Sequence, residues 1–206
     1  MAKQFYLSTL CYTSNKRNKV FYCIMGTLKK DFKYKKIKNF LTIDEVKFFR
    51  RYTIMYHQNN IDNFDFKQNK NADTSSYSDF AMEALMIGKK ELVEKESGLK
   101  VIPTYSYWRC YTKFADLKEH KDRPSCEVSV TCQISSCGTK WPIIIDENEI
   151  YLEDGDAVMY WGTDVLHSRK EFNGDYHIQT FLHYVDADGP YKEFAKDKRL
   201  NYGMKE

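Results

Sequence analysis

Residues 111–134 read YTKFADLKEHKDRPSCEVSVTCQI, and this stretch carries the pattern on which both the fold and the chemistry depend. Its second part, EVSVTCQI, alternates polar and apolar residues, which indicates a β-strand. The H-K-D triplet at 120–122 lies in the loop that enters this strand. Side chains at positions i and i+2 of an extended chain point to the same side, so His120 and Asp122 can present a nitrogen and a carboxylate oxygen together.

The same two-residue period extends in both directions from this stretch. Upstream, Tyr105, Tyr107, Arg109 and Tyr111 share one face of a predicted strand. Downstream follow WPIII, EIYL, DAVMYW and HIQTFLHYV, separated by the turn signals DENE, EDGD and FNGD. A set of roughly eight short strands of this kind predicts a mainly β domain of the jelly-roll type.

Two helices are expected before the strands. Thr42 and Glu45 have the spacing of a capping box, and apolar residues recur behind them at helical spacing as far as Tyr56. A second helix is expected at about 78–96, with Gly98 as its C-terminal cap. The Met and Phe residues of these helices are expected in the core, so the helices should flank the sheet.

The length of 206 residues and the lack of an obvious linker favour one domain. Residues 37–206 are expected to form it, with residues 1–36 as a basic N-terminal extension of the same domain. The Lys-rich run KKDFKYKKIK could contact an anionic partner, although such runs are more often simply solvated. Residues 57–75 are rich in Asn and Asp and predict a long loop, which could close over a substrate or be idle.

Composition argues against several classes of protein. The net charge of +3 is too small to indicate a nucleic-acid partner on its own. No apolar run approaches the roughly 18 residues of a membrane span, and the first residues lack the pattern of a signal peptide. None of the six cysteines forms a C-x-x-C pair. These features predict a reduced, cytoplasmic protein with no membrane partner, in which the cysteines act as small apolar groups.

A histidine from elsewhere in the chain could complete a metal site with His120 and Asp122. Two histidines and one carboxylate form a facial triad, which binds Fe(II) and leaves positions open for a chelating co-substrate and O₂. His167 follows EDGDAVMYWGTDVL, a predicted turn, strand and turn that would return it to the first pair. His183 in the last predicted strand is the alternative third ligand. Taken alone, H-x-D with a distant histidine arises often by chance.

Several segments taken together resemble the Fe(II)- and 2-oxoglutarate-dependent dioxygenases, and within them the prolyl 4-hydroxylase-like branch. IKNFLTIDEV resembles the opening strand and helix of that family, and CYTKFADLKEHKD its strand with a tyrosine before the H-x-D pair. SVTCQI, EDGDAVMYWGTDVLH and HIQTFLHYVD resemble the later core strands and the distal histidine. The resemblance covers about residues 37–186, in the family's order. It implies a double-stranded β-helix, which is a jelly roll.

The resemblance also implies an activity. His120, Asp122 and His167 would bind Fe(II) as the catalytic centre, and 2-oxoglutarate and O₂ would be consumed as a substrate C–H is hydroxylated. The aspartate completes the ligand set, which favours hydroxylation over halogenation. The implied substrate is a prolyl or other peptide side chain. The alternatives are oxidation of a nucleobase and a non-catalytic jelly-roll binding module.

One position departs from the family pattern. The family places Arg or Lys shortly after the distal histidine, where it pairs with the C5 carboxylate of 2-oxoglutarate, and here that position is His177. A neutral imidazole is a poor partner for a carboxylate. Arg109 is the preferred replacement because it neighbours Tyr111, which matches the family's 2-oxoglutarate-contacting tyrosine, and Arg169 is the alternative. Trp141 is a candidate substrate contact, although tryptophan is more often a core residue.

Overall fold

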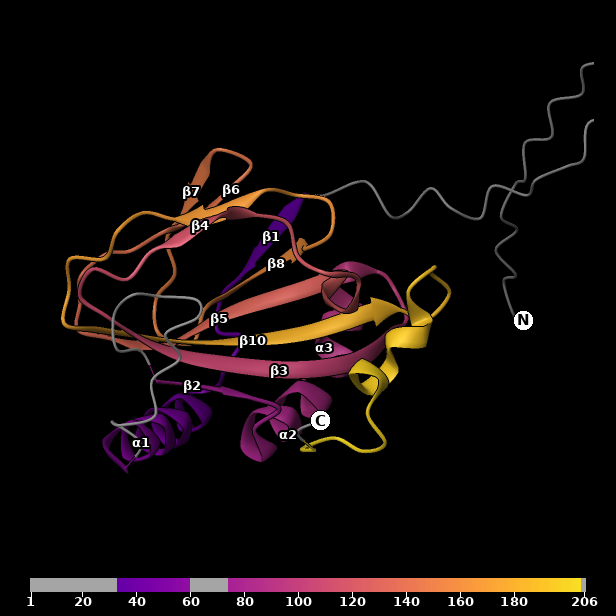
Figure 1. The fold of residues 1–206 in the computed structure, drawn as a ribbon, viewed down its shortest axis with the longest axis horizontal. Coiled ribbons are helices and arrows are strands. Elements are labelled where there is room, and N and C mark those ends of the chain that lie inside the picture. Colours follow the sequence, from indigo (N-terminus) through magenta and orange to yellow (C-terminus); the bar gives the residue numbers. More distant parts are fainter. Residues whose placement is uncertain (1–32, 60–73, 205–206) are drawn as a thin grey trace, which may run out of the picture.

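Two antiparallel sheets form the body of the molecule, for which the computed structural model describes residues 33–59 and 74–204 (Figure 1). The larger sheet has the order β1-β8-β5-β10-β3-β2 and the smaller one the order β4-β9-β6-β7. The strands of the larger sheet are β1 (Tyr34–Ile37), β2 (Thr74–Tyr77), β3 (Val101–Thr112), β5 (Val128–Ser136), β8 (Ala157–Trp161) and β10 (Tyr176–Asp186). Those of the smaller sheet are β4 (Leu117–His120), β6 (Ile143–Ile145), β7 (Asn148–Ile150) and β9 (His167–Arg169). The predicted mainly β jelly roll with flanking helices is confirmed.

The larger sheet is buried on both faces, and alternate side chains of its strands point to opposite faces. In β5, Val128, Val130 and Cys132 belong to the main hydrophobic core, on the side of the helices. Ser129 and Thr131 are equally buried, on the side of the smaller sheet. Polar side chains therefore point from β5 into the space between the two sheets, where they can form hydrogen bonds with other side chains.

Three helices cover the outer face of the larger sheet (Figure 1). The helix α1 (Ile43–Asn59) begins as predicted, because Thr42 Oγ1 accepts from the Glu45 N–H and Glu45 Oε2 accepts from the Thr42 N–H. The second predicted helix is instead two helices, α2 (Phe80–Gly88) and α3 (Lys90–Ser97), which meet at Lys89. Gly88 is a poor helix former at this break, and Lys89 pairs with Glu45 at 2.7 Å.

The other predictions for this region are confirmed only in part. Gly98 ends α3 in the left-handed conformation, with φ of 74°. Met82, Leu85, Met86 and Val93 of α2 and α3 lie in the main core, as predicted. Phe48, Met55 and Phe80 are instead exposed, so the prediction that the Met and Phe residues of the helices are buried is wrong for these three. Phe48 and Met55 are seven residues apart on one face of α1, and that face points to solvent. The described cysteines are free and, except for Cys137, buried.

Some sequence predictions fall outside the described residues. These are residues 1–32 of the predicted basic extension and residues 60–73 of the predicted loop. The last residues of the predicted extension are described, and they form β1, which pairs with β8. No helix in the described part of the chain is long and apolar enough to cross a membrane.

The chain that follows β10 packs back against the larger sheet through buried ionic contacts. Nη2 of Arg199 donates to Oε1 of Glu83 at 2.7 Å and to the backbone oxygen of Thr104 at 3.0 Å. The side chains of Arg199 and Glu83 are only 4% and 2% exposed. Nearby, Asp197 accepts hydrogen bonds from Arg123 and Tyr77. The C-terminal segment thus holds Arg123, the residue next to Asp122, in the connection between β4 and β5.

Removing one partner of the buried Glu83 and Arg199 pair should be strongly destabilising. Arg199→Met leaves a buried carboxylate without its cation, so we expect the free energy of unfolding in urea to fall by about 3–5 kcal/mol. Glu149→Gln is the control, because it breaks an exposed pair with Lys170 and should leave the free energy of unfolding close to the wild-type value. Equal small losses in both variants would show that the buried pair contributes little.

Candidate metal centre

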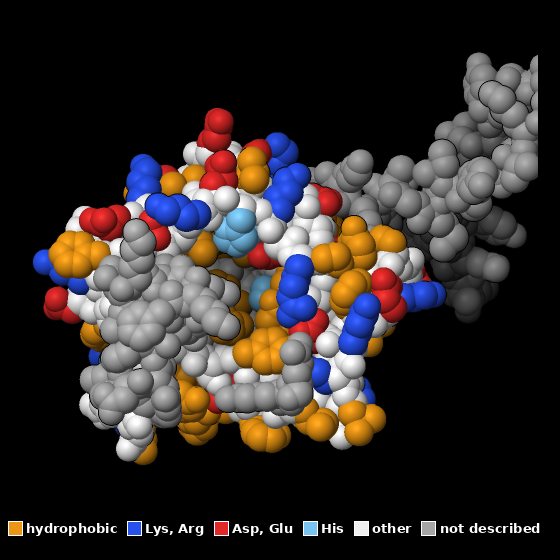
Figure 2. Space-filling view, in the orientation of Figure 1, with side chains coloured by type: hydrophobic (Ala, Val, Ile, Leu, Met, Phe, Trp, Pro, Cys, Tyr) orange, Lys and Arg blue, Asp and Glu red, His pale blue; other side chains and the backbone are white. Residues whose placement is uncertain are grey.

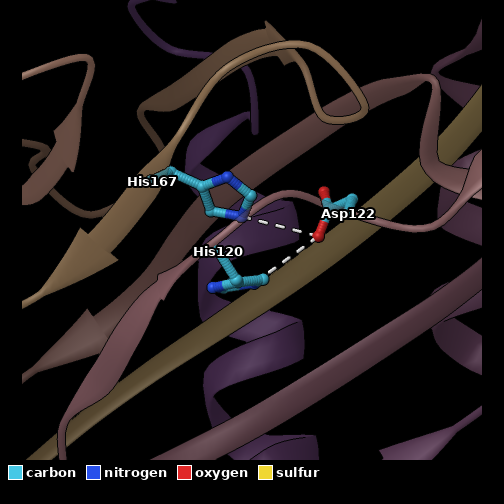
Figure 3. Close-up of side chains that lie close together, drawn as sticks. All are labelled: His120, Asp122 and His167. Atoms are coloured by element: carbon cyan, nitrogen blue, oxygen red, sulfur yellow. Dashed lines mark ion pairs between the residues drawn. The ribbon is translucent and has the colours of Figure 1, made fainter.

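The pairing of β4 with β9 brings together two histidines that lie far apart in the chain. His120 is the direct cross-strand partner of His167. Their rings are 4.2 Å apart, centre to centre. Asp122, just beyond the end of β4, turns its carboxylate toward both rings (Figure 3). One nitrogen from each histidine and one oxygen from Asp122 lie within 4.8 Å of one another, so the three predicted ligands converge.

Both imidazoles present Nε2 to the same oxygen. Oδ1 of Asp122 lies 3.6 Å from Nε2 of His120 and 3.5 Å from Nε2 of His167. Both distances exceed the roughly 3.2 Å limit of a good N–H···O bond. Nδ1 of His120 donates to the Lys118 backbone oxygen at 2.7 Å, which leaves the Nε2 lone pair free, and Nδ1 of His167 faces the Val165 oxygen at 3.3 Å. A carboxylate oxygen and two imidazole nitrogens held in this way fit a divalent cation.

Asp122 supplies a negative charge at neutral pH. Burial alone would raise its pKa, but the nearby His167 and His183 rings and the Ser129 hydroxyl outweigh burial and hold the pKa at about 2. The side chain of Asp122 is 15% exposed and that of His167 is 2% exposed, whereas that of His120 is 39% exposed. The candidate centre is therefore closed on the His167 side and open on the His120 side.

A cavity of about 520 Å³ lies between the two sheets and includes the three converging residues in its wall. Figure 2 shows the hollow on this face, with histidine, basic and hydrophobic side chains around it. The rest of the wall is mainly aromatic and basic, with Tyr77, Tyr105, Tyr107, Arg109, Tyr111, Leu117, Lys121, Arg123, Cys126, Ile143, Tyr160, Phe181 and His183. Asp122 is the one acidic residue among the described residues of this wall.

The two candidate arginines for an anionic ligand both lie near Tyr111. Arg109 is buried, lines the cavity and has its guanidinium 5.1 Å from the centre of the Tyr111 ring. Arg169 is also buried, stacks on Trp141 at 4.6 Å and donates to the Trp141 backbone oxygen at 2.6 Å. Burial lowers the pKa of Arg169 to about 10, partly offset by Tyr111 and Tyr160. No ion pair joins Arg169 to a carboxylate in the described part of the chain, so an anionic ligand nearby would compensate a costly buried charge.

His177 has the environment of a neutral side chain. Burial, with a further contribution from Arg169, holds its pKa well below the usual histidine value. Its Nε2 lies 2.9 Å from the Gln179 side-chain nitrogen, which donates to it. A neutral His177 lacks the charge that a carboxylate ligand would favour.

Trp141 lies behind the candidate centre. It packs against Tyr111, Phe172 and His177, and it is 6% exposed. It is not among the residues that line the cavity with the histidines. Its predicted contact with a substrate stays a prediction, and the structure gives it a packing role beside Tyr111 and Arg169.

Sequence reasoning missed a second group of side chains around Asp122. His183, the alternative third ligand, lies on the other side of the carboxylate, where Asp122, Cys126 and His183 also offer ligand atoms within 4.8 Å of one another. Burial lowers the pKa of His183 to about 4 and raises that of Cys126 to about 12, so both are neutral at pH 7. Ser129, between Asp122 and His183, was visible in the sequence only as a polar residue of an alternating strand.

Solved structures of other proteins share this architecture. The viral collagen prolyl hydroxylase vCPH of Paramecium bursaria Chlorella virus-1, solved as its 2OG complex, aligns with a TM-score of 0.55 at 12% identity, over 76% of this chain and 97% of its own. A Pseudomonas putida prolyl-4-hydroxylase aligns with a TM-score of 0.56 at 15% identity, over 75% of this chain and 92% of its own. This chain has the fold of the prolyl hydroxylases. HygX of Streptomyces hygroscopicus, solved with nickel and 2-oxoglutarate bound, aligns with a TM-score of 0.57 at 10% identity, over 76% of this chain and 83% of its own.

The predicted resemblance to Fe(II)- and 2-oxoglutarate-dependent oxygenases is therefore confirmed at the level of the fold. No protein-family model and no curated protein matches the chain. A shared fold does not by itself carry an activity, so the roles of His120, Asp122 and His167 depend on their own geometry.

Proposed function

We propose that this protein is a non-haem Fe(II)- and 2-oxoglutarate-dependent dioxygenase that hydroxylates a carbon atom of its substrate. The observation that carries the proposal is the convergence of His120, Asp122 and His167 on one point of the cavity wall. Two imidazole nitrogens and one carboxylate oxygen are the donors of the facial triad that binds Fe(II) and leaves three positions open. The fold of the chain is the one in which HygX was solved with a metal and 2-oxoglutarate.

The bound Fe(II) would supply the oxidation, in which O₂ and 2-oxoglutarate are consumed, CO₂ and succinate are released, and a substrate C–H becomes C–OH. The residues of the chain position the reactants. His120 and His167 are oriented by their Nδ1 contacts with backbone oxygens, so that Nε2 of each faces the cavity side of Asp122. The near-complete burial of His167 keeps bulk water from that side of the centre.

Arg109 and Tyr111 would bind the C5 carboxylate of 2-oxoglutarate. Both line the cavity from β3, on the face that also carries Tyr107. A guanidinium can pair with a carboxylate through two N–H groups, which neutral His177 cannot do. Arg169 lies behind this position and would add positive charge to it.

A peptide side chain is the substrate class that the cavity wall favours. Tyr77, Tyr105, Tyr107 and Phe181 contribute aromatic rings to the wall, and the Tyr77 and Tyr105 rings lie 5.0 Å apart. Aromatic grooves of this kind bind extended, proline-rich peptides. Three described lysines of the basic run at 29–38 that would favour nucleic acid are paired within the protein: Lys33 with Asp146, Lys35 with Glu96 and Lys36 with Asp156. These pairs give no support to the nucleic-acid alternative.

Two measurements test the proposed function. Anaerobic addition of Fe(II) and then 2-oxoglutarate should produce a weak visible charge-transfer band. In air, succinate release should be stimulated by one member of a panel of peptides, free amino acids and oligonucleotides. A purified protein that binds neither Fe(II) nor 2-oxoglutarate would be a non-catalytic jelly-roll module. Stimulation by oligonucleotides alone would contradict the peptide proposal and favour the nucleobase alternative.

A further inference from the structure

The side of the Asp122 carboxylate that faces away from His120 and His167 has its own set of contacts. Oδ2 of Asp122 accepts a hydrogen bond from Oγ of Ser129 at 2.8 Å. Ser129 is fully buried, and its Oγ also lies 3.0 Å from the Cys126 backbone oxygen and 3.0 Å from Nδ1 of His183. Oδ1 and Oδ2 of the carboxylate therefore have separate partners.

A count of protons gives these contacts a direction. The Ser129 hydroxyl has one proton, and the carboxylate of Asp122 is a stronger acceptor than the backbone oxygen of Cys126. Because the Ser129 hydroxyl donates its one proton to Asp122, its oxygen can only accept a hydrogen bond from His183. Nδ1 of His183 therefore carries a proton and donates it to Ser129. The order of donation is His183 to Ser129 to Asp122, and it fixes the tautomer of His183.

Gly162 also packs against the Asp122 carboxylate and its partners. The Asp122 N–H donates to the Gly162 backbone oxygen at 2.8 Å. A Cβ atom at position 162 would lie less than 3.0 Å from Oδ2 of Asp122, from the Cys126 oxygen and from Oγ of Ser129. Since real Cβ atoms do not approach other atoms so closely, any side chain at 162 would displace the carboxylate or its partners.

We propose that Ser129, His183 and Gly162 act as positioning residues for Asp122, here called the carboxylate clamp. The clamp occupies Oδ2, so that Oδ1 alone is presented to the point where His120 and His167 converge. Asp122 would then bind a metal through one oxygen and leave the remaining positions open. This inference rests on the proposed function, because it assumes a metal at that point.

The clamp also accounts for the second group of ligand atoms, Asp122, Cys126 and His183. Oδ2 of Asp122 and Nδ1 of His183 are both engaged by Ser129, and Sγ of Cys126 lies 3.0 Å from the Tyr105 hydroxyl. These atoms have partners within the protein and need no ion. A second bound metal that is lost in Cys126→Ser would contradict this explanation.

The test is anaerobic titration of the full chain with Co(II), followed by its visible absorption, which reports coordination without turnover. We expect Ser129→Ala and Gly162→Ala to weaken Co(II) binding about 10- to 100-fold, the usual effect of losing a partner of a metal ligand. Ser135→Ala is the matched control, because Ser135 is a fully buried serine of the same strand that does not line the cavity, and its Co(II) affinity should stay at the wild-type value.

Two variants of His183 separate positioning from packing. His183→Asn keeps a donor near the place of Nδ1 and should bind Co(II) nearly as well as wild type, whereas His183→Leu should resemble Ser129→Ala. If His183 acts through Ser129, the double variant with Ser129→Ala and His183→Leu should be no weaker than Ser129→Ala alone. Additive losses, equal effects of Asn and Leu, or wild-type affinity in Ser129→Ala would overturn the clamp.

Circular dichroism of the metal-free variants shows whether each one is folded. If Ser129→Ala does not fold, the Co(II) affinities of the two His183 variants test the clamp instead. Failure of the proposed function has a different signature, because the wild-type protein itself would then show no Co(II) absorption. In that case the clamp is overturned together with the metal site.

Discussion

Asp122→Ala should abolish Fe(II) binding and succinate release together, with a loss in metal affinity of more than about 100-fold. The expected loss exceeds that for a partner of a metal ligand, because the variant removes the one anionic donor of the site. Asp122 is also the one acidic residue in the described cavity wall, so no other carboxylate there can replace it. Anaerobic titration followed by the charge-transfer band measures the effect.

Asp116→Ala is the matched control for this variant. Asp116 pairs with Lys118 close to β4 and does not line the cavity, so its removal should leave the band and the affinity for Fe(II) unchanged. His167→Ala should reproduce the loss of Fe(II) binding expected for Asp122→Ala, since each residue supplies one ligand atom to the same site. Full binding of Fe(II) by Asp122→Ala would show that the metal is held elsewhere in the chain.

Arg109→Met should raise the 2-oxoglutarate concentration needed for half-maximal succinate release by about 30-fold or more. Truncating one partner of a buried charged pair costs at least about 2 kcal/mol, which corresponds to about that factor. Affinity for Fe(II) should change by no more than about twofold, because Arg109 is not one of the converging ligands. The 2-oxoglutarate dependence of succinate release and an Fe(II) titration together measure the two effects.

Arg169→Met and Lys170→Met complete this set of variants. Lys170 is the exposed neighbour of Arg169 and pairs with Glu149, so its loss should have no effect on 2-oxoglutarate. Arg169→Met should raise the 2-oxoglutarate requirement less than Arg109→Met, because Arg169 lies behind the cavity wall. A larger effect of Arg169→Met would assign the carboxylate to Arg169 instead.

The candidate site was predictable from the sequence to different degrees for its different parts. His120 and Asp122 are two residues apart on an extended segment, so the direction of their side chains follows from local geometry. His167 was a weaker prediction, drawn from a turn-strand-turn pattern and from the resemblance, because the pairing of β4 with β9 depends on the whole roll. The sequence named His183 only as an alternative third ligand, and it gave no signal for Ser129 or Gly162. The contacts of these three residues around Asp122 exist only after three strands and a turn have come together.

The sequence by itself determined the capping box of α1, the glycine that ends α3 and the alternating faces of β3 and β5, because each depends on atoms only a few residues apart. The division of the second predicted helix at Lys89, the partnership of His120 with His167 and the burial of Arg109 and Arg169 were decided by the tertiary structure alone. Burial, strand register and the partner of a charged group are set by chain segments distant in sequence, and only their packing brings such segments into contact.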